Sequence, residues 1–276
     1  MFRMTILSNC HTHTQFCDGR STAEEMVLSA IENKFVSLGF STHGPQMYDP
    51  DYCVIPEEEQ AYKDEILRLR EKYQDKIRIW LGIERDLFSC ADPRGYDYYL
   101  ASVHYIPTTD GYMSVDGNVD ILAEGIKKYL NGDGLMFAQR YFELLSGYAR
   151  AYHPPIIGHF DLVRKNNTRL HFADEESTAY KDMVVSALSA IRKTGAMLEV
   201  NTGAIGRGYM QSVYPSDFAL KEWLKLGGEV IVSSDCHDAK YIACAFDEMP
   251  GLLRKIGYDH VVRLGSGKDL FDRVAL

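Results

Sequence analysis

The sequence predicts an α/β fold, namely a TIM-like (β/α) barrel that forms a single domain. Short apolar runs alternate with longer helical patterns along the chain, which is typical of a mainly parallel sheet with helical crossovers. Seven or eight such units recur, and this number favours a closed barrel over an open sheet. The length of 276 residues also suits a single-domain barrel, which has about 250 residues.

The first half of the chain carries the first four predicted strands, and helical patterns separate them. The strands are expected at residues 5–8, 38–43, 77–84 and 98–104. A helix is predicted over 21–35, where Ser21 is a good N-cap and Glu24 completes a capping box. A second helix is predicted over 56–73, because Pro56 suits a first turn and apolar residues then recur at helical spacing.

The second half continues the alternation. Its strands are expected at residues 155–161, 196–203 and 229–237, followed by a short run at 260–265. Its helices are expected near residues 119–130, 136–152, 174–193, 216–227, 239–256 and 268–276. The first two of these helices are interpreted as an insert near residues 110–153 within one domain that spans residues 1–276.

Composition argues against several classes of protein. The net charge of −9 argues against nucleic acid as a partner, because phosphate backbones require a basic surface. No run of about 18 apolar residues occurs, so we expect no transmembrane helix and no membrane partner. The start, "MFRMTILSNC", is too short and too polar for a signal peptide. We therefore expect a cytoplasmic protein whose six cysteines are free thiols.

Histidines and acids gather after the predicted strands, and six of the seven strands end in such a residue. The set comprises His11, His13, Asp18, His43, Glu84, His104, His159, Asp235 and His237. The C-terminal strand ends of a (β/α) barrel converge on one face, so these side chains are expected to meet in one cavity. Imidazole and carboxylate groups suit Zn²⁺, Mn²⁺ or Fe²⁺. The pattern therefore predicts a metal site.

A structural interpretation competes with the metal site for any single histidine. Taken alone, His43 or His104 would more often be a hydrogen-bonded core residue than a ligand. The recurrence of such residues at successive strand ends favours the metal site for the set as a whole. Three histidines, His153, His171 and His260, stand outside the pattern, and we expect them to be structural or exposed to solvent.

The motifs resemble those of a known family. In order, "HTHTQFCDGR", "STHG", "GIE", "ASVHY", "GHFD" and "SSDCH" resemble the polymerase and histidinol phosphatase (PHP) superfamily, over nearly the whole chain. The segments "GIERDL", "YYLASVHY" and "GHFDLVRKNN", together with the long helical insert, are similar to the monofunctional histidinol-phosphate phosphatases. The resemblance implies a distorted (β/α)7 barrel of PHP type with three divalent metal ions, which would be zinc, iron or manganese.

The resemblance also implies how the ligands divide among the ions. The first ion would be held by His11, His13, Glu84 and Asp235. Glu84 would bridge to the second ion, which His104 and His159 would complete. The third ion would be held by Asp18, His43 and His237. Some members of the superfamily have histidine at the position of Asp18, so the identity and occupancy of the third ion stay open.

The implied reaction is the hydrolysis of L-histidinol phosphate to L-histidinol and phosphate, in histidine biosynthesis. A hydroxide that bridges two ions would attack phosphorus, and the ions would neutralise charge on the phosphoryl oxygens. The leaving oxygen would take its proton from Asp18, from His237 or from a metal-bound water. Arg164 and Arg207 follow the fifth and sixth strands and could bind phosphate oxygens. Asp161 is interpreted as a residue that orients a ligand histidine.

Two other functions remain open at this stage. The chain could be a PHP phosphoesterase that acts on another phosphomonoester or on a nucleotide. It could also be a non-catalytic, metal-stabilised PHP module, although such modules often lose ligands and all nine expected positions are filled here. In the favoured interpretation the only partner is a small phosphomonoester substrate. The sequence leaves the oligomeric state open.

Overall fold

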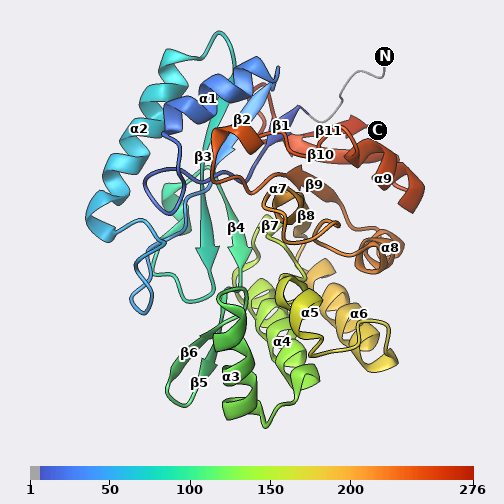
Figure 1. Ribbon diagram of the computed structural model, residues 1–276. Coiled ribbons are helices and arrows are strands. Elements are labelled where there is room, and N and C mark those ends of the chain that lie inside the picture. Colours follow the sequence, from blue (N-terminus) through green and yellow to red (C-terminus); the bar gives the residue numbers. More distant parts are fainter. Residues whose placement is uncertain (1–6) are drawn as a thin grey trace.

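A computed structural model describes residues 7–276 (Figure 1). Its centre is a nine-stranded sheet in the order β1-β2-β3-β4-β7-β8-β9-β10-β11. The strands are β1 (Ser8–Asn9), β2 (Ser37–Phe40), β3 (Arg78–Asp86), β4 (Tyr98–Ser102), β7 (Ile156–Ile157), β8 (Met197–Asn201), β9 (Val230–Ser233), β10 (His260–Leu264) and β11 (Phe271–Ala275). All neighbours are parallel except β10 and β11. The predicted α/β fold with a mainly parallel sheet is confirmed, and residues 5 and 6 of the first predicted strand lie outside the described residues.

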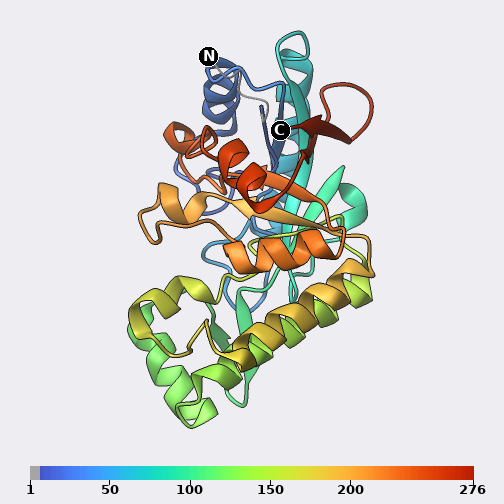
Figure 2. The same ribbon diagram turned by 90° about the vertical axis from the view of Figure 1, so that its right-hand side faces the viewer.

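Helices cover the outside of the sheet. They are α1 (Ala23–Glu32), α2 (Glu59–Lys72), α3 (Val119–Leu130), α4 (Gly134–Tyr152), α5 (Arg164–Leu170), α6 (Thr178–Arg192), α7 (Gly203–Gly206), α8 (Asp217–Lys225) and α9 (Met249–Ile256), with 3-10 turns at Pro56–Glu58, Pro93–Gly95 and Ala239–Tyr241. In Figure 1, α1 and α2 lie on one side of the sheet and α8 and α9 on the other. Figure 2 shows α4 and α6 packed side by side. Within residues 7–276, no helix combines the length and apolarity that a membrane span requires.

The sheet is strongly curled, as the side chain of Tyr98 shows. Tyr98 lies on β4, yet its hydroxyl donates a hydrogen bond to the Cys10 carbonyl, directly after β1, at 2.6 Å. The phenol passes over Gly39 and Gly82, where an added Cβ would come within 2.1 Å and 2.4 Å of Tyr98 atoms. These two glycines therefore leave the space that the buried tyrosine fills. Because β2 and β3 separate β1 from β4 in the sheet, this contact requires a curved sheet.

The curl brings the segments after β1 and β9 into contact. Thr12 forms an isolated parallel bridge with Cys236, and the His13 amide donates a hydrogen bond to the Cys236 carbonyl at 2.9 Å. The two segments carry the adjacent residues His11 and Asp235 as well. Residues more than 220 positions apart in the chain therefore come together at one end of the sheet.

The cap of α1 lies one residue later than the sequence pattern predicts. The Thr22 hydroxyl accepts a hydrogen bond from the Glu25 amide at 3.1 Å, and the Glu25 carboxylate accepts one from the Thr22 amide at 2.7 Å. The predicted pair, Ser21 and Glu24, has the same spacing, so local sequence could not distinguish the two. The Ser21 hydroxyl instead accepts a hydrogen bond from the Ala239 amide, a contact between distant segments.

A hairpin and two short α-helices were not predicted. The hairpin of β5 (Tyr105–Thr108) and β6 (Gly111–Ser114) precedes α3, the helix α5 follows β7, and the helix α7 follows β8. Thr109 and Asp110 form the two-residue loop, and Gly111 follows it with a φ of 130°, a conformation that glycine adopts readily. The helices α3 and α4 agree closely with the two helices predicted near residues 119–130 and 136–152.

The predicted C-terminal helix at residues 268–276 is wrong. This segment forms β11, which pairs antiparallel with β10 and ends the sheet. Nine residues are too few to form a stable helix without strong packing. The free edge of β10 supplies hydrogen-bonding partners that a sequence pattern does not reveal, and Leu270 and Phe271 pack against the buried cluster that contains Trp80.

Candidate metal centre

The nine histidines and acids predicted at the strand ends come together in the structure. A cavity of about 570 Å³ is lined by Asp18, His43, Glu84, His104, His159, Asp235 and His237. The two remaining members, His11 and His13, are completely buried and lie within 3.6 Å of Glu84. Glu84 lies near the C-terminal end of β3, and the other eight side chains lie on segments that follow the C-terminal ends of parallel strands, as expected for a (β/α) barrel.

Four of these side chains form a compact group around one point. His11 Nε2 lies 3.1 Å from Glu84 Oε2 and 3.6 Å from Asp235 Oδ1. His13 Nε2 lies 3.5 Å from Glu84 Oε2 and 3.2 Å from Asp235 Oδ1. Ligands at about 2.1 Å from a tetrahedral ion are roughly 3.4 Å apart, so these four separations suit ligands of one ion. The ligand atoms of His11, His13 and Glu84 all lie within 4.8 Å of one another.

Unsatisfied polar atoms support this fit. Among the described residues, His11 Nε2, His13 Nε2 and Glu84 Oε2 are buried and have no hydrogen-bond partner. They approach one another without hydrogen-bond geometry, although a buried polar atom normally has a partner. A cation between them would satisfy all three atoms, so the donor set fits a metal ion.

Glu84 connects the first group to a second group. While its Oε2 faces His11 and His13, its Oε1 lies 2.8 Å from His159 Nε2 and 3.4 Å from His104 Nε2. Ser102 also donates a hydrogen bond to Oε1 at 2.6 Å. A carboxylate whose two oxygens face different imidazole groups has the arrangement that a bridging ligand needs.

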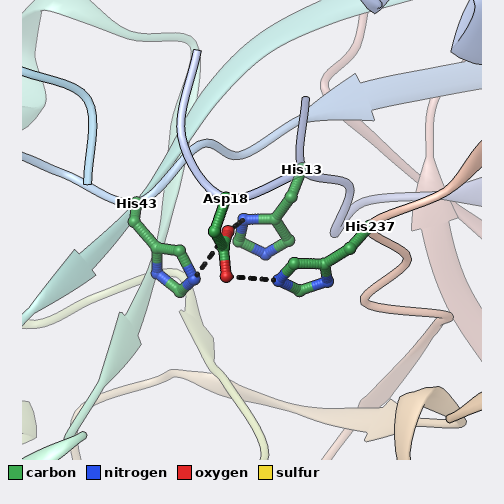
Figure 3. A group of neighbouring side chains, drawn as sticks. All are labelled: His13, Asp18, His43 and His237. Atoms are coloured by element: carbon green, nitrogen blue, oxygen red, sulfur yellow. Dashed lines mark ion pairs between the residues drawn. The ribbon is translucent and has the colours of Figure 1, made fainter. Parts of the chain in front are cut away.

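A third group surrounds Asp18 and is shown in Figure 3. Asp18 Oδ2 lies 3.2 Å from His237 Nε2, and Asp18 Oδ1 lies 3.7 Å from His43 Nε2. His13 Nδ1 is 4.0 Å from the same Oδ1. The three groups therefore share members. His13 belongs to the first group and adjoins the third, and His43 of the third group contacts Glu84 of the first, with its Nδ1 2.9 Å from Glu84 Oε2.

At Glu84 and His13 the electrostatic environment favours the protonation states that metal binding needs, whereas at His11 and His104 the neighbouring carboxylates outweigh burial and raise the pKa. Burial alone would raise the pKa of Glu84, but His11, His43 and His104 hold it well below its usual value. Burial lowers the pKa of His13 well below its usual value, and His237 and His43 lower it further. An ionised carboxylate and a neutral imidazole are the forms that bind cations.

Two buried acids that orient ligand histidines were missed by sequence reasoning. Glu199, on β8, accepts a hydrogen bond from His11 Nδ1 at 2.6 Å. Asp86, at the end of β3, accepts one from the His104 amide at 2.7 Å and lies 3.2 Å from His104 Nδ1. The sequence contained a signal that could have identified them. Each is an acid within an apolar strand, "AMLEVN" or "WLGIERD", and a buried acid requires hydrogen-bonding or charged partners.

Asp161 does not orient a ligand histidine, in contrast to the sequence-based interpretation. Its Oδ2 accepts a hydrogen bond from the Ser216 amide at 2.8 Å and lies 3.5 Å from the Arg164 guanidinium. Asp161 therefore anchors the segment before α8. The sequence could not show this because the direction of the side chain depends on the turn after β7.

The two arginines expected at the phosphate site are placed differently. Arg207 lines the cavity, where Nη2 donates to Asp235 Oδ2 and Nη1 lies beside His237 Nδ1, both at 2.9 Å. Arg164 does not line the cavity, because its guanidinium pairs with Glu175 at 2.8 Å. Its neighbour Lys165 lines the cavity instead.

The physical reason for this difference is helix geometry. Arg164 and Lys165 open α5, and consecutive side chains on a helix diverge by about 100°. Lys165 therefore faces the cavity, where its Nζ donates to Asp116 Oδ2 at 2.9 Å and lies 4.6 Å from the centre of the Tyr209 ring. A sequence pattern cannot decide which of two adjacent cations faces inward.

The three histidines outside the motif pattern lie away from the cavity. His153 and His171 are exposed and end α4 and α5 in left-handed conformations, with φ of 47° and 49°. His260 begins β10 and faces Asp259 and Glu229. The expectation that they are structural or exposed agrees with these positions.

Comparisons with known proteins agree with this geometry. A family model described as "PHP domain" matches residues 9–203. The "Probable histidinol-phosphatase" of Schizosaccharomyces pombe is 24% identical, over 94% of this chain and 90% of the relative. The histidinol-phosphatase of Bacillus subtilis is 25% identical, over 86% and 96%. A crystal structure of Lactococcus lactis histidinol phosphate phosphatase, complexed with zinc, L-histidinol and phosphate, has a TM-score of 0.69 and 21% identity and covers 94% and 97% of the two chains.

Proposed function

Because this chain belongs to the PHP domain family, we propose that it is a metal-dependent phosphatase that hydrolyses L-histidinol phosphate to L-histidinol and phosphate. The observation that carries this proposal is the convergence of nine histidines and acids around Glu84 and Asp18 in one cavity. The names of the relatives support the substrate. The zinc, L-histidinol and phosphate in the Lactococcus lactis structure belong to that protein and support the same choice here.

Three divalent ions, zinc, iron or manganese, are proposed for the centre. The first would be held by His11, His13, Glu84 and Asp235, the second by Glu84, His104 and His159, and the third by Asp18, His43 and His237. When bound, such ions supply Lewis acidity toward phosphoryl oxygens and water. The carboxylates contribute three negative charges to the ligand sets, and three divalent ions would exceed them, so the cavity would attract a phosphate dianion although the chain is acidic.

The residues of the chain have separate tasks in this reaction. Arg207 is held by Asp235 and His237, so it supports the ligand set while its exposed part faces the cavity. Lys165 is the better candidate for binding a phosphate oxygen, because within the described part of the chain its one anionic partner is Asp116, whereas the Arg207 guanidinium contacts two residues of the ligand sets. His237 Nε2 and Asp18 Oδ2 face each other at 3.2 Å. We assign the proton for the leaving oxygen to this pair in the absence of the third ion, because the same two side chains are its ligands when it is bound.

A substrate panel tests the proposed function. We expect phosphate release from L-histidinol phosphate to exceed release from other phosphomonoesters and nucleotides by orders of magnitude in kcat/KM. Elemental analysis of the same sample should find two to three equivalents of transition metal per chain, because nine ligand positions surround the three proposed ions. A preference for another phosphomonoester would contradict the proposed substrate but would still support a phosphatase. If the metal-loaded protein hydrolysed none of the compounds, the chain would instead be a non-catalytic PHP module.

Lys165 and Arg164 form a matched pair for testing the phosphate site. Lys165→Met should lower kcat/KM roughly 10- to 150-fold, since a lost charge-assisted hydrogen bond is worth about 1.5–3 kcal/mol. Arg164→Met should leave kcat/KM within about threefold, because the Arg164 guanidinium pairs with Glu175 outside the cavity. It should instead lower the free energy of unfolding by about 1–3 kcal/mol, because the buried Asp161 carboxylate loses its neighbouring cation. A large loss of kcat/KM in Arg164→Met, together with a near wild-type value in Lys165→Met, would assign phosphate binding to Arg164.

A further inference from the structure

Glu199 is a fully buried carboxylate that lies outside the three proposed ligand sets. Both of its oxygens are occupied. Oε1 accepts hydrogen bonds from His11 Nδ1 at 2.6 Å and from the Ser233 hydroxyl at 2.5 Å. Oε2 accepts them from the His159 amide at 2.7 Å and from Asn201 Nδ2 at 3.0 Å. Neighbours from three other segments therefore point their donors at one side chain.

We propose that Glu199 is a positioning residue that couples the first and second ligand sets, so that its loss weakens the binding of both ions together. The proposal rests on the metal centre of the proposed function. It concerns a residue of β8, a strand that supplies no proposed ligand, and it assigns that strand a role in the centre.

The link to the first set acts through the His11 ring. When Nδ1–H donates to Glu199, the lone pair of His11 lies on Nε2, which faces Glu84 and Asp235. A carboxylate that receives the second ring nitrogen fixes both the tautomer and the orientation of a ligand histidine. Glu199 therefore makes His11 Nε2 an acceptor at the point where the first ion would lie.

Two further links extend from the same carboxylate. The His159 amide donates to Oε2, which fixes the backbone that carries the His159 ring beside Glu84 Oε1. Asn201 Nδ2 contacts both Glu199 Oε2 and Asp235 Oδ2, the latter at 3.2 Å. One buried carboxylate thus restrains a residue of the second set and, through Asn201, a second residue of the first set.

Only an acceptor can occupy this position, because all four neighbours donate. A glutamine would have to direct its NH2 group either at His11 and Ser233 or at His159 and Asn201. In the first orientation His11 would have to change tautomer and direct Nε2–H at the first ion site. In the second orientation two donors would face the amide, and the backbone at His159 would shift. Both orientations disturb a ligand set.

The test measures successive dissociation constants for Mn²⁺ and Zn²⁺, by competition with a chelator, in wild type, Glu199→Gln and Asp161→Asn. The Asp161 variant is a matched control, because it replaces an equally buried carboxylate whose partners are Ser216 and Arg164. Glu199→Gln should raise the dissociation constants of the first and second ions by about 10- to 100-fold each. Asp161→Asn should stay within about threefold of wild type.

The third ion is an internal control, because within residues 7–276 the hydrogen-bond partners of Glu199 are His11, Ser233, His159 and Asn201, none of which holds this ion in the proposed centre. Its dissociation constant should change by less than about threefold. Wild-type dissociation constants for all ions in the Glu199→Gln variant would overturn the proposal. Weaker binding of one ion alone would overturn it as well. A lower melting temperature of the metal-free variant with unchanged metal affinity would also overturn it, since that result describes a purely structural residue.

Asn201→Ala decides the question if Glu199→Gln does not fold. This variant removes the link from Glu199 to Asp235 but leaves His11 and His159 bound to the carboxylate. It should weaken the first ion by roughly tenfold and leave the second within about threefold. Wild-type affinity for both ions would overturn the coupling. Wild-type protein that binds no metal would instead contradict the proposed function, so the two failures can be distinguished.

Discussion

Glu84→Gln should lower the turnover of L-histidinol phosphate at least about 100-fold. Each oxygen of Glu84 faces imidazole nitrogens of a different group, so the variant loses negative charge at two proposed ions at once. Its NH2 group would also direct N–H donors at nitrogens that should bind a cation. Loss of residues that only orient metal ligands typically costs 10- to 100-fold, so loss of a bridging ligand should cost at least as much. Steady-state phosphate release and metal content, measured on the same sample, provide the check.

Two histidine variants control for general effects of substitution. His153→Asn and His260→Asn should each keep turnover within about threefold of wild type, because both side chains lie away from the cavity. Their circular dichroism and melting temperatures should match those of wild type closely. Losses in these variants as large as the loss in Glu84→Gln would mean that the histidines are wrongly assigned to their roles.

Removal of the metal ions should abolish turnover, and Mn²⁺, Zn²⁺ or Fe²⁺ should restore it. The same treatment should lower the melting temperature. Without cations, the buried carboxylates of Glu84, Glu199 and Asp235 all lie within 3.6 Å of the His11 ring, where their negative charges repel one another. Ions that bind only the folded chain stabilise it by mass action.

Activity assays and thermal unfolding before and after chelation measure both effects. The melting temperature should rise again with added metal and should depend on its concentration. Chelated protein with full turnover would contradict a metal-dependent mechanism. Fully active protein with one equivalent of metal or none would contradict the trinuclear centre.

The strand ends show how far the sequence could predict the candidate site. Its nine histidines and acids follow predicted strands, and the structure brings all nine around one cavity and its buried floor. This was possible because parallel strands of a (β/α) barrel all end on one face, so a position after a strand already determines a place in space. The alternation of strands and helices is equally local, and most of the predicted elements are present within a few residues.

Only the tertiary structure decided which neighbours each side chain meets. It placed Lys165 rather than Arg164 at the cavity, because the start of α5 sets the direction in which adjacent side chains point. It also assigned to Glu199 the orienting role that the sequence suggested for Asp161. At the C-terminus it formed β11 in place of a helix, because the edge of β10 offered hydrogen bonds to residues 271–275. Each outcome depends on a partner distant in the chain, and a local pattern carries no information about that partner.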